Sequence, residues 1–121
     1  MVQPKIEWEK IGDVAVFYLE GKDFSNEISI VENQIRSGIT QGREVKFILE
    51  ISKFEWISTP ELSKLINCLI ISRNRGGDLK VAGTTRNVYE VMEIIEILQV
   101  LESYNSVREA VKSFNYKKEA K

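Results

Sequence analysis

Apolar and polar residues alternate with two kinds of pattern along the chain, one typical of strands and the other of helices. Short runs rich in β-branched and aromatic residues predict strands, at 14–19, 45–51 and 78–83. Apolar residues at three- and four-residue steps predict helices, over 25–42, 59–75, 87–98 and 107–114. Strands and helices therefore alternate along most of the chain.

Three further segments have a weaker pattern. Residues 5–8 predict a short first strand. The stretch after residue 98 fits either a longer helix or an edge strand. We prefer a strand near Val100–Leu101, because Tyr104 to Ser106 then form a turn and a fresh helix cap. Residues 115–121 are expected to form a charged, frayed tail.

The first helix illustrates the expected boundaries. Ser25 or Asn26 is its expected N-cap, Gly42 its end, and Glu27 lies on its polar face. The alternation of strands and helices along the whole chain predicts one α/β domain, with its core over about 12–114. We expect a mixed, mostly parallel sheet of about five strands with about four helices.

Composition narrows the classes of function. The 17 basic and 18 acidic side chains nearly cancel, which argues against nucleic-acid binding. The chain has no histidine, and its one cysteine, Cys68, lies in an apolar run, so we predict an inert thiol and no catalytic residue, metal or cofactor. The N-terminus lacks a signal-peptide core, and no apolar run approaches the ~20 residues of a membrane span. We expect a cytoplasmic protein without membrane insertion that is not an enzyme.

Two adjacent hydroxyls precede the clearest helix. Ser58 can cap this helix together with Glu61, or Thr59 can cap it with Pro60 at the first helical position. In both arrangements a hydroxyl lies at a helix N-terminus, where partial positive charge gathers. Trp56 is interpreted as a partly buried anchor of this turn, in preference to the apolar centre of an interface.

Four segments have the order and spacing of a known family. They are Leu49–Ser52, Trp56–Leu62, Gly76–Leu79 and Tyr104–Val111. Together they resemble the STAS family (sulfate transporter and anti-sigma factor antagonist domains). The resemblance implies a single STAS-like domain of the anti-sigma factor antagonist type. Such a domain binds an anti-sigma factor that is also a serine kinase, and thereby frees a sigma factor.

In antagonists of this family the turn typically reads Asp-Ser-Ser-Gly-Leu-Gly, and the first serine accepts a phosphoryl group from the partner. The matching positions of this chain are, in order, Ser58, Thr59, Pro60, Glu61, Leu62 and Ser63. The resemblance therefore implies Thr59 as the acceptor, with Ser58 as the second candidate. The motif is degenerate, because Pro60 lacks an N–H donor and Glu61 adds a charge of the same sign as phosphate.

The resemblance also implies a surface for the partner, an anti-sigma factor or serine kinase. The residues expected to contact that partner are Phe54, Trp56, Ser58, Thr59, Glu61 and Leu62. Two alternatives stay open at this point. The hydroxyls can be helix caps without phosphorylation, and the chain can be an accessory subunit of a transport or lipid-trafficking complex that binds an ATPase. The resemblance also leaves a homodimer open.

Overall fold

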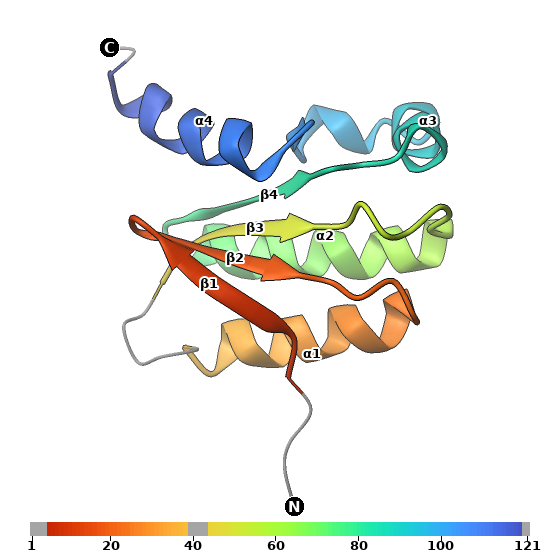
Figure 1. Ribbon diagram of the computed structural model, residues 1–121, viewed down its shortest axis with the longest axis horizontal. Coiled ribbons are helices and arrows are strands. Elements are labelled where there is room, and N and C mark those ends of the chain that lie inside the picture. The colour runs from red at the N-terminus through yellow and green to blue at the C-terminus, as the bar shows by residue number, and fades with distance from the viewer. Residues whose placement is uncertain (1–4, 39–43, 120–121) are drawn as a thin grey trace, which may run out of the picture.

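A computed structural model describes residues 5–38 and 44–119, and five strands of this part of the chain form a mixed sheet (Figure 1). The strands are β1 (Glu7–Ile11), β2 (Val14–Tyr18), β3 (Lys46–Glu50), β4 (Asp78–Ala82) and β5 (Ser103–Tyr104). They lie in the order β1-β2-β3-β4-β5. β1 is antiparallel to β2, and the other neighbours are parallel. The parallel pairs require crossover connections, which the helices supply.

Helices cover the two faces of the sheet. They are α1 (Phe24–Arg36), α2 (Thr59–Asn74), α3 (Arg86–Ile94), the short 3₁₀ helix η1 (Ile97–Gln99) and α4 (Val107–Glu119). Buried side chains of α1, α2, α3 and η1 join one cluster with the sheet, whereas those of α4 join a second cluster on the other face. Figure 1 shows α2 and α4 on opposite sides of β4.

The two clusters follow from the alternation of side chains along β2 and β3. Phe17, Phe47 and Leu49 enter the larger core, and Val16 and Ile48 enter the smaller one. All five are fully buried, and the Phe17 and Phe47 rings lie 6.1 Å apart between centroids. Both faces of these strands are therefore covered, as the nearly continuous apolar run at 14–19 predicts for β2.

The start of α1 differs from its prediction. Asp23, rather than Ser25 or Asn26, is the N-cap, and its side chain accepts a hydrogen bond from the Asn26 N–H. The helix begins at Phe24 because this side chain, 2% exposed, packs into the core. Glu27, expected on the polar face, is buried at 5% exposure.

The end of α1 also comes earlier than predicted. The helix ends at Arg36, and Gly38 follows with a φ of +82°, where its N–H donates to the Ile35 carbonyl at 3.1 Å. This left-handed conformation suits glycine and closes the helix. The predicted end at Gly42 lies outside the described residues.

The strand predicted near Val100–Leu101 is wrong in position. Leu101 is fully buried beside η1 in the larger core, and the strand follows it at Ser103–Tyr104. The parallel pairing with β4 places it there, since the Val81 N–H donates to Glu102 and the Gly83 N–H to Tyr104. Pairing with a distant strand overrides the turn expected at Tyr104.

Both ends of the described chain are more regular than expected. The first strand exists, as predicted, but it runs over Glu7–Ile11 and pairs with β2. At the other end, α4 continues to Glu119. Residues 115–119 therefore extend the last helix instead of forming a tail.

Candidate functional site

A closed capping box forms the start of α2. Ser58 is the N-cap, with extended backbone, and its Oγ accepts a hydrogen bond from the Glu61 N–H at 3.2 Å. Glu61 Oε1 in turn accepts a hydrogen bond from the Ser58 N–H at 2.9 Å. Thr59 and Pro60 are the first two helical residues. Of the two predicted caps, the structure therefore selects Ser58.

The predicted contact residues divide into exposed and buried groups. Trp56 is 69% exposed, Ser58 and Thr59 are exposed, and Glu61 is half-buried. Phe54 and Leu62 are 5% and 0% exposed. These two side chains pack into the core, so the exposed members of the predicted set are the ones that a partner can reach directly.

The packing of the turn before α2 determines which of these side chains are exposed and which are buried. Phe54 packs edge-to-face on Phe24, with ring centroids 5.1 Å apart, and Ile57 is 3% exposed. Trp56 lies between these two anchors and points outward. The interpretation of Trp56 as a partly buried anchor is wrong, because the anchoring contacts are made by its neighbours.

Residues after β4 hold the same turn from the other side. Thr85 Oγ1 donates to the Phe54 carbonyl at 3.2 Å, and Asn87 Nδ2 donates to Glu55 Oε1 at 3.1 Å. Neither residue is identified as part of the site by its local sequence, because each contact joins positions about 30 apart in the chain. Thr85 also caps α3, because its Oγ1 accepts a hydrogen bond from the Val88 N–H. One hydroxyl therefore holds both the turn before α2 and the start of α3.

A hollow of about 490 Å³ lies beside Trp56. Its lining comes from the loops after β2 and β3 and from the starts of α1 and α2: Gly21, Lys22, Asp23, Phe24, Lys53, Phe54, Glu55, Trp56 and Glu61. The hollow lies just beyond the carboxyl ends of two parallel strands, where open α/β sheets commonly bind their ligands. Its two lysines and three carboxylates give it mixed charge.

Glu27 fixes one wall of this hollow. Its buried carboxylate accepts hydrogen bonds from the backbone N–H groups of Glu20, Lys22 and Asp23, at 2.6, 2.9 and 3.2 Å. The two loops also touch, because a Cβ added to Gly21 would lie 2.7 Å from the Cβ of Lys53. The walls around Trp56 are thus held by short contacts before any partner arrives.

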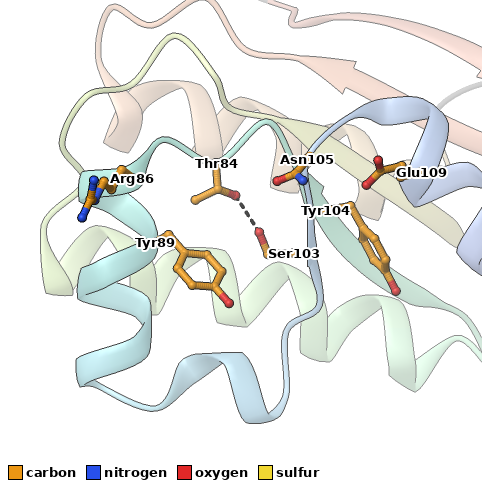
Figure 2. A pocket seen from close by; sticks show the side chains of 7 residues that line it. All are labelled: Thr84, Arg86, Tyr89, Ser103, Tyr104, Asn105 and Glu109. Atoms are coloured by element: carbon orange, nitrogen blue, oxygen red, sulfur yellow. Dashed lines mark hydrogen bonds between the residues drawn. The ribbon is translucent and has the colours of Figure 1, made fainter.

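A second hollow, of about 430 Å³, lies where β4 and β5 end (Figure 2). It is lined by Thr84, Arg86, Tyr89, Ser103, Tyr104, Asn105 and Glu109. The Thr84 and Ser103 hydroxyls bond to each other at 2.8 Å, and Arg86 forms an ion pair with Glu90 at 3.3 Å. None of the predicted contact residues lines it, so the two hollows are separate features.

Cys68 carries the one thiol of the chain. Burial raises the pKa of the Cys68 thiol to about 12, which keeps it protonated and unreactive near neutral pH. Residues 5–38 and 44–119 contain no group of three or more acidic or cysteine side chains that could hold a metal ion. None of the described helices has the length and apolar content to cross a membrane.

Comparison with known proteins identifies the family. Residues 5–110 match the family model of the STAS domain, so the chain belongs to the STAS domain family. No curated protein matches the chain. The family and the α/β fold predicted from the sequence are thereby confirmed.

Several solved structures share this fold. A serine-to-glutamate variant of RsbS from Moorella thermoacetica has a TM-score of 0.79 and 13% identity, covering 96% of this chain and 99% of that chain. An anti-sigma-factor antagonist (STAS) domain protein from Planctomyces limnophilus gives 0.73 and 14%, covering 91% and 97%. The phosphorylated form of the Bacillus cell fate determinant SpoIIAA gives 0.68 and 12%, covering 90% and 98%. At these identities the likeness establishes the fold alone.

Proposed function

We propose that this chain is a regulatory protein-binding module of the anti-sigma factor antagonist type, whose partner is an anti-sigma factor with serine kinase activity. The observation that carries the proposal is Trp56, a large aromatic side chain left 69% exposed at the edge of a hollow and next to the capped turn. The STAS fold and the antagonists among its structural relatives support the class of partner.

The contact surface consists of Trp56, Ser58, Thr59 and Glu61. Tryptophan is enriched among the residues that dominate binding energy at protein interfaces. The turn that carries it is held by Phe54, Thr85 and Asn87, so little flexibility is lost on binding. A side chain that is exposed but held by a rigid turn is well suited to enter a complementary pocket of a partner.

Any phosphoryl chemistry at this surface belongs to the partner kinase, and the chain is at most its substrate. Thr59 is the better acceptor of the two hydroxyl residues. Ser58 Oγ accepts the Glu61 N–H within the cap, whereas the Thr59 side chain is exposed on the first turn of α2. We therefore assign phosphorylation, where the partner carries it out, to Thr59.

The test is calorimetric titration of the protein with each anti-sigma-type serine kinase encoded in the same genome. We expect Trp56→Ala to weaken binding by at least tenfold and up to about 30-fold. Ile94→Ala is the matched control, because Ile94 is also apolar and 79% exposed but lies at the end of α3. Equal affinities of the two variants, or no binding by any such kinase, would contradict the proposal. Mass spectrometry after incubation with ATP then reports whether Thr59 carries phosphate.

A further inference from the structure

We infer that the Glu61 carboxylate already takes the place of an anion at the N-terminus of α2, so that a phosphate on Thr59 opens the capping box instead of docking on the helix. This inference deepens the proposed function, since it rests on the Ser58–Glu61 turn being the regulated surface. It concerns the stability of the chain itself, however, and it is tested without any partner.

The backbone donors of the first turn are nearly all used or missing. The Glu61 N–H donates to Ser58 Oγ at 3.2 Å, and the Leu62 N–H donates to the Ser58 carbonyl at 2.9 Å. Pro60 has no N–H. Within the described residues, the amide of Thr59 is the one donor of this turn without a hydrogen bond in the structure. An anion at a helix N-terminus normally binds several such donors together.

Glu61 already places a negative charge at the N-terminus of the helix. Glu61 Oε1 accepts the Ser58 N–H at 2.9 Å, which keeps its carboxylate at the positive end of the helix dipole. A phosphate on Thr59 adds roughly −1.5 to −2 charges two residues away. The two anions then compete for the same donors and repel each other.

Lysines of neighbouring segments are the candidates to offset this repulsion. Lys64 directs its Nζ to Ser25 Oγ on α1, at 3.4 Å. Lys53 lies on the loop before the turn and lines the hollow beside Trp56. If either lysine reached the phosphate, the modification would stabilise the turn, and the measurement below would show the opposite sign.

Opening the box has a direct consequence for recognition. Ser58 is two residues after Trp56, and its N–H is one of the two reciprocal bonds that fix the chain there. In the transfer, Thr59 Oγ1 forms a bond to the γ-phosphorus of ATP, ADP leaves, and the hydroxyl proton passes to a base of the kinase. In the product the capping bonds after Trp56 are lost, while Phe54 and Thr85 still hold the residues before it. Phosphorylation therefore weakens binding by loosening one side of the contact surface.

The experiment is a double-mutant cycle with phosphothreonine incorporated genetically at position 59. Four proteins are compared by thermal unfolding: Thr59 or phosphothreonine, each with Glu61 or with Glu61→Gln. Glutamine keeps the reciprocal hydrogen bonds of a capping box but removes the charge. Beside Glu61 we expect the phosphate to lower Tm by about 3–6 °C. In the Glu61→Gln background we expect less than half of this decrease.

Amide hydrogen exchange locates the effect. We expect protection of the Glu61 amide to fall by about tenfold or more on phosphorylation, whereas amides in the middle of α2 change little. A Tm that is unchanged or higher beside Glu61, or an equal decrease in both backgrounds, would overturn the inference. Neither result bears on whether the unmodified surface binds a kinase, so the two proposals fail separately.

Discussion

At the scale of single residues, the phenol of Tyr18 is bonded to Glu9 and lies in the field of two carboxylates. Burial raises its pKa to about 12, assisted by its hydrogen bond to Glu9 and by the charges of Glu9 and Glu50. A folded pKa above the unfolded value of about 10 means that the neutral phenol favours the folded state. This contribution is fully present below pH 10 and is lost as the pH rises through 12.

The raised pKa of Tyr18 and its effect on stability can be measured directly. In an absorbance titration at 295 nm we expect the Tyr18 phenol to ionise near pH 12, and Tyr18→Phe to remove that phase. Urea unfolding should show stability falling between pH 10 and 12 in the natural chain, and falling less in Tyr18→Phe. If Tyr18→Phe instead removes a phase near pH 10, the assignment is contradicted.

At the scale of elements, Glu27 ties the loop after β2 to the first turn of α1. Three backbone N–H groups lose their acceptor in Glu27→Ala, at a position that is 5% exposed. Because hydrogen bonds to a buried charge are among the strong ones, we expect unfolding free energy to fall by about 2–4 kcal/mol. Urea denaturation measures this change.

Glu32→Ala is the matched control on the same helix. Glu32 forms an ion pair with Arg36 one turn away, at 2.9 Å, and such partly exposed pairs contribute under about 1 kcal/mol. If the two substitutions cost the same, the hydrogen bonds of Glu27 do not hold the loop.

The elements also show which signals sequence reasoning can use. The start of α2 is predictable because Ser58, Pro60 and Glu61 act on their own neighbours. The start of α1 is not, since Asp23 and Ser25 are both capable caps and only the burial of Phe24 decides between them. β5 is misplaced by a few residues for a related reason: a two-residue strand has no periodicity, and its position is set by pairing with β4.

At the scale of the whole molecule, alternating strands and helices predict the layers and the class of sheet, and the turn at the start of α2 locates the candidate site. What completes the site is not local. Thr85 and Asn87 reach the turn from beyond β4, and Trp56 is exposed because Phe54 and Ile57 are taken up by the core. Contacts across about 30 residues carry no local signal, so only the folded chain shows them.

Lys80 is the other feature that only the whole molecule explains. It is fully buried in β4, beneath α4, where its Nζ lies 2.6 Å from Ser113 Oγ and 3.2 Å from Glu102 Oε1. The same atom is 4.1 Å from the centre of the Phe114 ring. One ammonium therefore connects the sheet to α4 in the smaller core, where desolvation opposes much of what these contacts contribute.

Two substitutions separate the contacts of Lys80 from its burial. Lys80→Met keeps a flexible side chain against Phe114 and removes the buried charge. Glu102 still accepts a hydrogen bond from the Tyr104 hydroxyl at 2.5 Å, and Ser113 still donates to the Ala110 carbonyl at 2.7 Å. For Lys80→Met we therefore expect the free energy of unfolding to stay unchanged or to rise by up to about 2 kcal/mol. Glu102→Ala removes one charge partner of the buried ammonium and should cost about 2–4 kcal/mol. If urea denaturation gives the reverse order, the Lys80 contacts outweigh desolvation, and α4 is held on the sheet mainly by charge.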